Sequence, residues 1–153
     1  MGCCEKSQGK RNCVCKVLRE ISDAQSDIQE ICCDTSCDQS IKDLLGETEE
    51  TNSLDTVPVL LYCQDGCKPF KGFGAHPRRI SRVQASFYFR VKKVKKDCCA
   101  VIELLRDPSD ENKNPKNPVE QRTKNLRATG ICMNVDLHCF CHVTCLPAIS
   151  ALN

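Results

Sequence analysis

The sequence predicts an α+β protein, in which an N-terminal amphipathic helix is followed by a mainly antiparallel, β-sandwich-like domain. Apolar residues recur at three- and four-residue steps between Val14 and Ile31, which is the spacing of one helix face. Apolar and polar residues alternate over residues 86–94, which is the spacing of a half-buried strand. Asp65-Gly66 is a strong signal for a tight turn between antiparallel strands.

The chain of 153 residues has the length of one domain, flanked by an arm and a tail. Residues 1–12 are polar and carry paired cysteines, so we predict a flexible arm that bears cysteines. We expect a single cysteine-rich assembly domain over residues 13–149, with its helix over residues 13–31 and its β-region over residues 57–146. Residues 150–153 are left as a short tail.

Three segments of the β-region have strand character: residues 57–63, 86–94 and 98–105. The predicted tight turn follows the first of them, and Cys63 and Cys67 flank that turn. Residues across such a turn can face one another, so this pair is the leading candidate for an intrachain disulfide. The alternative is a pair of buried thiols at the same positions.

Composition predicts two irregular segments. The acidic stretch that ends at Asp55 has few apolar residues, so we expect a loop with a short helix there. Residues 107–127 are rich in Asp, Asn, Lys and Pro. They predict a mobile surface loop that buries almost nothing.

The last predicted strand covers residues 130–146. Cys139, Cys141 and Cys145 share one parity with apolar residues, so their sulfurs would line the apolar face of a regular strand. Successive residues on one face lie about 6.6 Å apart, which is too far for a disulfide. The partners of these sulfurs are therefore expected on neighbouring strands or neighbouring molecules.

Cysteine usage is the main functional signal, because 15 of the residues are cysteine. Such a content is typical of disulfide scaffolds in oxidising compartments. Yet no apolar run of signal-peptide or membrane-spanning length occurs, so we expect synthesis in a reducing cytosol and later oxidation. Since the count is odd, at least one sulfur must stay reduced, hold a metal or bond to another molecule. The cross-linking candidates are Cys3, Cys4, Cys13, Cys15, Cys32, Cys33, Cys37, Cys63, Cys67, Cys98, Cys99, Cys132, Cys139, Cys141 and Cys145.

Charge is segregated along the chain although the formal net charge is only +2. Residues 20–55 are acidic with Lys42 as their one base, and residues 68–96 are basic with no acid. One interpretation is solvated faces or pairing within the chain, and the other is head-to-tail attraction between copies. The predicted assembly patches are Glu20, Asp23, Asp27, Glu30, Arg78, Arg79, Arg82, Lys92 and Lys93.

A zinc site is the main alternative use of the thiols. Cys139, Cys141, His142 and Cys145 have the right residue types, but no pair of CxxC elements is present. On a regular strand, His142 would also point away from the three sulfurs. The alternative function is therefore a zinc-stabilised, cysteine-rich cytosolic adaptor, while the leading hypothesis requires no cofactor.

The sequence does not predict an enzyme. A cysteine nucleophile needs a nearby base, and none of His76, His138 and His142 singles out one thiol. No Gly-rich phosphate loop or GxSxG element occurs. Nucleic acid and membranes are not expected partners, because the basic run lacks organised stacking aromatics and no apolar span is present.

Several short motifs occur in an order that resembles a known family. They are Asn12-Cys13-Val14-Cys15, Thr56-Val57-Pro58, Phe89-Arg90-Val91, Asp97-Cys98-Cys99-Ala100, Val135-Asp136-Leu137, Cys139-Phe140-Cys141 and Cys145-Leu146. Together they resemble the spore coat protein Y/Z family of endospore-forming bacteria. The sulfurs that match the family pattern are Cys13, Cys15, Cys98, Cys99, Cys132, Cys139, Cys141 and Cys145.

The resemblance implies a structural protein of the spore surface layers, the outer coat or exosporium. It implies synthesis in the mother-cell cytoplasm, self-assembly into an ordered two-dimensional lattice and cross-linking by intermolecular disulfides. The implied partners are other copies of the chain and other coat or exosporium proteins. Lysis of the mother cell would supply the change in redox conditions that late oxidation requires.

Overall fold

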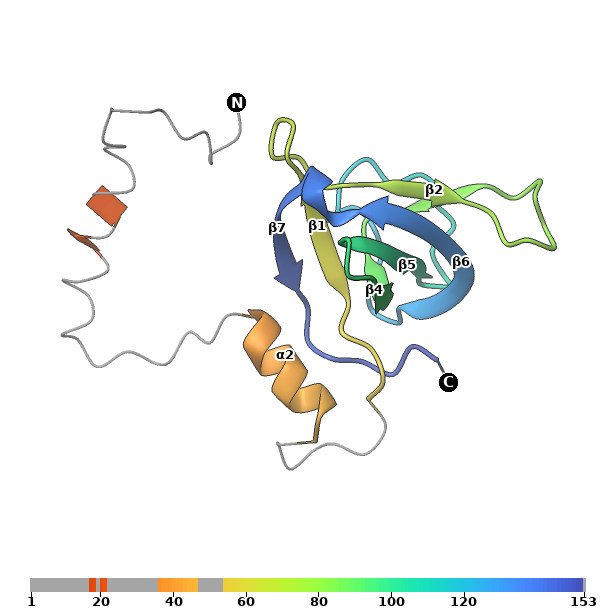
Figure 1. Ribbon diagram of the computed structural model, residues 1–153. Helices are drawn as coiled ribbons and strands as arrows, with labels where there is room; N and C mark the ends of the chain where they lie inside the picture. The colour runs from red at the N-terminus through yellow and green to blue at the C-terminus, as the bar shows by residue number, and fades with distance from the viewer. Residues whose placement is uncertain (1–16, 19, 22–35, 47–53, 153) are drawn as a thin grey trace.

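The computed structural model describes residues 17–18, 20–21, 36–46 and 54–152 (Figure 1). Antiparallel β-structure dominates this part of the chain, which confirms the mainly antiparallel prediction. The elements are α2 (Ser36–Leu44), β1 (Val59–Cys63), β2 (Gly72–Gly74), β3 (Gln84–Ser86), β4 (Phe89–Val94), β5 (Cys99–Arg106), β6 (Arg127–Asp136), the 3-10 turn η1 (Leu137–Cys139) and β7 (Phe140–Cys145).

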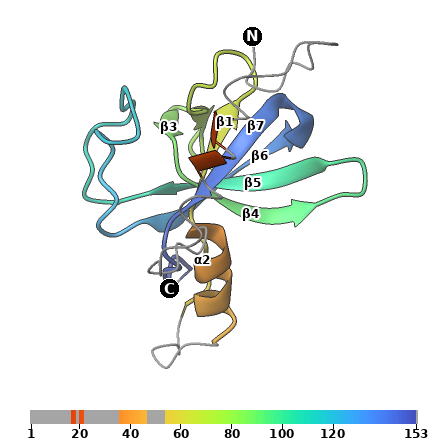
Figure 2. The same cartoon turned by 90° about the vertical axis from the view of Figure 1, so that its left-hand side faces the viewer.

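Five strands form one antiparallel sheet in the order β6-β5-β4-β1-β7, and β2 and β3 pair separately as a two-stranded ribbon. β5 pairs with both β4 and β6 over most of its length. β1 meets β4 at a single pair, Val59 opposite Phe89, but pairs with β7 along its whole length. Figure 2 shows the β4–β5 turn and the loop before β6 extending from opposite ends of the sheet.

The sheet is strongly curved. β6 and β7 are its edge strands, yet only the three residues of η1 connect them. So short a connection can join opposite edges only if the sheet coils until those edges approach one another. Irregular pairing in β1–β7, β4–β5 and β5–β6 adds bends, because extra residues in one strand increase its twist. The domain is therefore a rolled sheet, and not the two facing layers of a sandwich (Figure 1).

The β2–β3 ribbon packs directly against residues of the rolled sheet. A Cβ atom at Gly72 would lie 2.7 Å from Met133 Cε and 2.9 Å from Phe89 Cε1. A Cβ at Gly74 would lie 2.6 Å from Ile131 Cγ2. Glycine at both positions therefore lets the ribbon backbone approach the core closely.

Two apolar clusters form the core. Phe89, Ile102 and Leu104 have no solvent exposure, and the ribbon covers Phe89. The first cluster contains Val59, Leu61, Phe89, Ile102, Leu104, Ile131 and Cys145. The second contains Phe87, Tyr88, Leu105, Leu126 and Ala151.

The expectation that residues 107–127 bury almost nothing is wrong. Pro115 and Gln121 are buried in this segment. Gln121 Nε2 donates to Ser86 Oγ at 2.9 Å, and its Oε1 accepts from the Phe87 backbone N–H at 2.9 Å. Counting apolar residues misses such a segment, because polar groups that satisfy each other can also be buried.

Arg106 anchors the start of that segment and is 3% exposed. Its guanidinium donates to the carbonyl oxygens of Ala85 at 2.7 Å and Asn112 at 2.7 Å, and lies 3.8 Å from an Asp110 carboxylate oxygen. Burial lowers the pKa of Arg106, whereas the charges of Asp110 and Asp107 raise it. Burial is the larger effect, so the net pKa is lowered, and the carbonyl contacts and the carboxylate offset only part of the cost of burying this charge.

The predicted tail at residues 150–153 is fastened to the domain through Ala151, although Leu152 is exposed. Ala151 is 3% exposed, and its N–H donates to Asp55 Oδ1 at 2.9 Å. Burial raises the pKa of Asp55, but hydrogen bonds from Thr56, Ala151 and Leu152 outweigh it, so the net pKa is lowered. The C-terminal residues therefore belong to the domain, and the separate tail is a wrong prediction.

The helix predicted over residues 13–31 lies mostly outside the described residues. Within that range Val17, Leu18, Glu20 and Ile21 are helical, and their side chains are exposed. The helix that the structure does describe is α2, within the acidic stretch where a short helix was expected. Among the described residues, no helix has the length and apolar composition needed to cross a membrane.

The single strand predicted over residues 130–146 is wrong, because η1 divides it into β6 and β7. Asp136 accepts a hydrogen bond from the His138 N–H at 2.9 Å and so caps η1. The Leu137 N–H donates to the Cys98 carbonyl at 3.0 Å, which holds the break against the start of β5. The break interrupts the two-residue period on which the predicted row of sulfurs depended.

Candidate assembly and cross-linking site

Cys37 on α2 and Cys145 at the end of β7 form a disulfide, with their Cα atoms 4.8 Å apart. Cys145 lies in the first core cluster, and Ser40 Oγ donates to the Leu146 carbonyl at 2.6 Å beside it. The bond closes a long loop, since 108 positions separate the two residues. A loop of that length corresponds to about 4 to 5 kcal/mol of chain entropy in the unfolded state. Oxidation thus fastens α2 to the sheet.

Cys132 and Cys139 are exposed thiols of the domain. Cys132 lies on the edge strand β6, where Lys92 Nζ is 3.8 Å from its sulfur. Cys139 is the last residue of η1, and its carbonyl accepts from the Gln64 N–H at 2.8 Å. Their exposure makes these two sulfurs accessible to another molecule.

Cys98 and Cys99 lie at the turn between β4 and β5, and both are half-buried. Cys98 has a φ of 64° and belongs to the turn, so β5 begins only at Cys99. The negative charge of Asp97, burial and a hydrogen bond to Asp97 raise the pKa of the Cys99 thiol. At neutral pH this keeps Cys99 protonated and slows its reaction with electrophiles.

We expect Asp97→Asn to increase the alkylation rate of Cys99 at pH 7. Removing the charge lowers the pKa of the thiol toward its ordinary value, while the amide oxygen can still accept from the Cys99 N–H. Because the thiolate is the reactive form, a lower pKa raises the thiolate fraction and with it the rate at pH 7. Peptide-resolved alkylation across pH 6 to 9 measures the rate, with Cys132 as the internal reference. An unchanged Cys99 profile would contradict this role of Asp97.

The Cys63–Cys67 disulfide predicted from the turn is not formed. Cys67 Sγ instead lies 3.8 Å from Cys141 Sγ on β7. His142 Nδ1 lies 3.4 Å from the same Cys141 sulfur. The structure thus places a histidine beside a thiol that the regular-strand argument had separated from it.

The four residues of the alternative zinc site do not form a cluster. Cys145 is bonded to Cys37, and Cys139 is exposed on η1. Among the described residues, no group of three or more His, Cys, Asp or Glu side chains has an arrangement able to hold a metal ion. The remaining cysteine candidates lie outside the described residues: Cys3, Cys4, Cys13, Cys15, Cys32 and Cys33.

Arg78, Arg79 and Arg82 are exposed in the turn between β2 and β3, residues 75–83, which we call the ribbon turn. They line an open pocket of about 700 Å³ together with His76 and Lys113, among others. Ile80, at the tip of the same turn, is 79% exposed. The ribbon turn therefore presents three cations together with the exposed apolar side chains of Ile80 and Val83.

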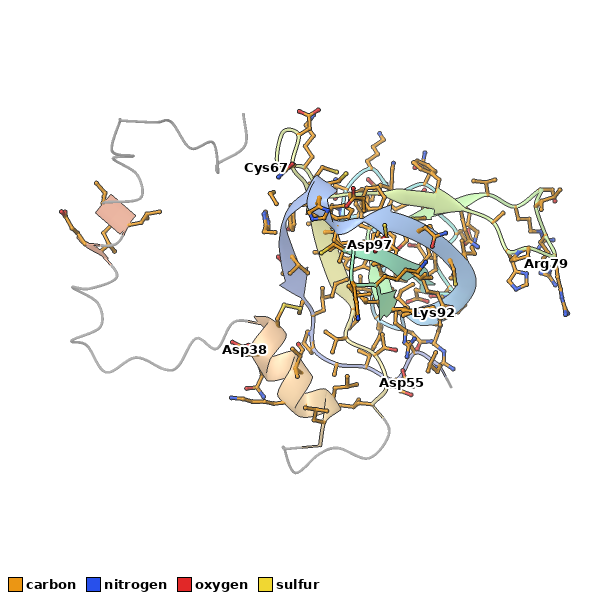
Figure 3. All side chains as sticks on the ribbon, in the orientation of Figure 1. Asp38, Asp55, Cys67, Arg79, Lys92 and Asp97 are labelled. Carbon is orange, nitrogen blue, oxygen red and sulfur yellow. A yellow bond between two sulfur atoms is a disulfide. The ribbon has the colours of Figure 1, made fainter. Side chains whose placement is uncertain are left out.

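Lys92 and Lys93 are not part of the ribbon turn. They are exposed on β4, and Lys92 Nζ lies 3.9 Å from Glu103 Oε1 within the sheet. Figure 3 shows Lys92 apart from Arg79. The basic segment of the sequence thus divides into two regions in space.

Of the predicted acidic patch, Glu20 is described and exposed, whereas Asp23, Asp27 and Glu30 lie outside the described residues. α2 carries the acid Asp38 and the exposed apolar side chain of Ile41, and the exposed Leu45 follows directly after the helix. Figure 3 shows Asp38 and Arg79 on opposite sides of the domain. The acidic and cationic surfaces thus point in different directions, an arrangement that permits contacts between copies.

A family model described as Spore coat protein Z matches residues 1–148 of the chain. The chain belongs to the spore coat protein Z family. The Spore coat protein Z of Bacillus subtilis (strain 168) is 27% identical over 150 residues, covering 92% of each chain. No solved structure matches the chain. The family resemblance drawn from the short motifs is confirmed, and it supports a structural role in the spore coat.

Three functional features of this spore coat protein Z family member were missed from the sequence. The Cys37–Cys145 pairing and the Cys67–Cys141 contact depend on how distant segments meet. The effect of Asp97 on Cys99 has a local signal, because an acid two residues before a thiol can cap the turn and act on the sulfur.

Proposed function

We propose that the chain is a self-assembling structural subunit of the spore coat or exosporium, without enzymatic activity. Copies dock head to tail into an ordered two-dimensional lattice, and disulfides between chains then fasten the contacts. Exposure of the Cys132 and Cys139 sulfurs on a domain with an intrachain Cys37–Cys145 disulfide carries this proposal. The intrachain bond stabilises the subunit, while the exposed sulfurs can reach a neighbour.

The docking contact joins the ribbon turn of one copy to α2 of the next. Ile80, 79% exposed, faces solvent among Arg78, Arg79 and Arg82. Ile41 on α2 and Leu45 directly after it are 48% and 68% exposed, and Asp38 lies in the first turn of the helix. Exposed apolar side chains on both surfaces, with arginines on one and Asp38 on the other, give a complementary pair of surfaces.

The two surfaces occupy different sides of one chain, so the contact is heterologous. Each copy that docks through its ribbon turn leaves its own α2 available for the next copy. Such contacts propagate unless they close into a ring. This geometry supports an extended assembly in preference to an isolated dimer.

Late oxidation is consistent with docking of the copies first and disulfide formation afterwards. In a reducing mother-cell cytoplasm the thiols remain reduced, and charge and apolar contacts can equilibrate before covalent bonds form. Oxidation then fixes neighbours that are already in register. Other coat proteins with exposed thiols can join the assembly through the same chemistry.

The test is to oxidise assemblies made from equal amounts of unlabelled and nitrogen-15-labelled chains. We expect disulfide-linked peptides containing Cys132 or Cys139 with mixed labels, because a mixed pair can arise only between chains. The Cys37–Cys145 peptides should carry a single label and serve as the internal control. Oxidised material that runs without reductant as single 17.1 kDa chains would overturn the proposal.

We expect the double substitution Cys132→Ser and Cys139→Ser to reduce the interchain species on a non-reducing gel. Serine keeps the size of each side chain but cannot form a disulfide. The control is Cys63→Ser, because Cys63 is half-buried. This variant should give the same interchain species on the gel as the wild type. Equal amounts of interchain species from the double variant and the wild type would show that these two sulfurs do not cross-link.

A further inference from the structure

The structure brings three reactive groups together where the turn after β1 meets β7. Cys141 Sγ lies 3.8 Å from Cys67 Sγ, 3.4 Å from His142 Nδ1 and 3.5 Å from the carbonyl oxygen of Cys63. Both Cys67 and Cys141 are half-buried, so a small molecule can reach them. Figure 3 shows Cys67 in the turn that follows β1.

A β-bulge explains why the neighbouring side chains of Cys141 and His142 meet. Tyr62 pairs with His142 across β1 and β7, but Cys63 pairs with Phe140, so Cys141 has no residue opposite it. An extra residue breaks the alternation of side chains between the two faces and re-aims one of them. The sulfur and the imidazole can therefore meet, which a regular strand would prevent.

The imidazole is held in place by its cross-strand neighbour. The rings of Tyr62 and His142 stack with their centroids 3.8 Å apart and an angle of 19° between their planes. When the imidazole proton is on Nε2, Nδ1 is an acceptor and can take the proton of the Cys141 thiol. A thiol with a fixed base beside it is the arrangement of a nucleophilic cysteine.

Cys67 is placed to complete an exchange reaction. It lies in the turn that contains Gly66 and has a φ of 50°, outside any strand. Its sulfur must approach Cys141 Sγ by about 1.8 Å to reach disulfide bond length. A turn residue can make that movement by side-chain rotation with little change in the sheet.

We propose that Cys67, Cys141 and His142 form a thiol–disulfide exchange site whose substrate is a small-molecule disulfide of the glutathione type. The Cys141 thiolate attacks one sulfur of the substrate, forming a mixed disulfide and releasing one small thiol. The Cys67 thiol then attacks the Cys141 sulfur and releases the second small thiol, which leaves a Cys67–Cys141 disulfide. Two protein thiols are oxidised and one substrate disulfide is reduced.

The site is independent of the proposed lattice, since all its groups belong to one chain. Its product is a second intrachain bond, which joins the turn after β1 to β7. The same oxidant thus closes this pair within a subunit and leaves the exposed sulfurs for contacts between subunits. A failure of lattice formation would not affect the exchange reaction, and the reverse also holds.

The test is to incubate dilute, reduced full-length protein with oxidised glutathione and follow each cysteine by peptide mapping. We expect a Cys67–Cys141 link, and we expect Cys67→Ser to accumulate glutathione on Cys141. Cys63→Ser is the matched control, because it keeps the backbone carbonyl near Cys141 and should still form the link. A Cys63–Cys67 link, or loss of the Cys67–Cys141 link in Cys63→Ser, would overturn the proposal.

The role of the base is tested with His142→Phe, which keeps a ring to stack on Tyr62 but removes Nδ1. We expect glutathionylation of Cys141 in the Cys67→Ser background to slow by about tenfold at pH 7, and less at pH 9 where thiols ionise unaided. An equal rate at pH 7 would show that the imidazole does not activate the thiol. Zinc retained stoichiometrically by the reduced wild type and lost in Cys141→Ser would also overturn the proposal in favour of a metal site.

Discussion

Reversing the charge of the ribbon turn is expected to prevent ordered assembly of the reduced protein. In the contact proposed above, the substitutions Arg78→Glu and Arg79→Glu place acids opposite Asp38 of the next copy, so attraction becomes repulsion. A single exposed ion pair contributes only about 0 to 1 kcal/mol. The effect is large because two charges change sign and because the contact repeats through the assembly.

A second variant makes this experiment specific for the proposed contact. Asp38→Lys and Asp43→Lys make α2 basic, and this protein alone should also fail to assemble, since its ribbon turn is unchanged. Mixing the two variants should restore assembly, because each ribbon turn then meets an α2 of opposite charge. Light scattering and electron microscopy at low salt measure the outcome, since salt screens exposed charges.

The mixture supplies the control for misfolding, because two misfolded proteins would not recover order when combined. Failure of the mixture to assemble, although each variant unfolds cooperatively, would show that α2 and the ribbon turn are not partners. Unimpaired assembly of either variant alone would lead to the same conclusion.

Phe89→Ala is expected to cause the largest loss of stability. Phe89 has no solvent exposure, and its ring centroid lies 5.5 Å from that of Phe70. The Phe89 ring also packs against the backbone at Gly72, so removing the ring opens a cavity between the rolled sheet and the ribbon. Truncating a buried phenylalanine typically costs about 3 to 5 kcal/mol in the free energy of unfolding.

The matched control is Val91→Ala on the same strand, where the side chain is 42% exposed. We expect this variant to lose less than about 1 kcal/mol, because little apolar area is removed from the core. Urea denaturation under reducing conditions measures both variants without a contribution from the Cys37–Cys145 disulfide. Equal losses for the two variants would contradict the placement of Phe89 in the core.

The mainly antiparallel sheet could be predicted from the sequence, because alternation of apolar and polar residues is a local property. Residues 98–105 predict β5 to within one residue at each end, but the strand predicted over residues 86–94 is too long, because Ser86 ends β3 and β4 begins at Phe89. The buried polar network of residues 107–127 could not be predicted in the same way. Gln121 is buried because Ser86 and Phe87 offer it partners, and those partners lie more than thirty positions away in the chain.

The sulfur chemistry shows the same division. The abundance and odd number of cysteines indicated cross-linking, and the motifs around Cys98-Cys99 and Cys139-Phe140-Cys141 indicated the family. The pairing of sulfurs was predicted wrongly at Cys63 and Cys67, since proximity in sequence does not establish proximity in space. The bulge at Cys141 and the break at η1 both interrupt the alternation of side chains between the two faces of a strand. The face on which a cysteine lies therefore cannot be predicted there from its position in the sequence.

Composition, periodicity and motif order thus determined the structural class, the family and the prominence of sulfur in this protein. All three properties follow from the residue content and from short stretches of sequence. Only the tertiary structure decided which sulfurs lie inside and which lie outside, and which thiol meets a histidine. The physical reason is that burial and distance depend on how the sheet coils. Pairing between strands far apart in the chain, such as β1 with β7, determines that coiling.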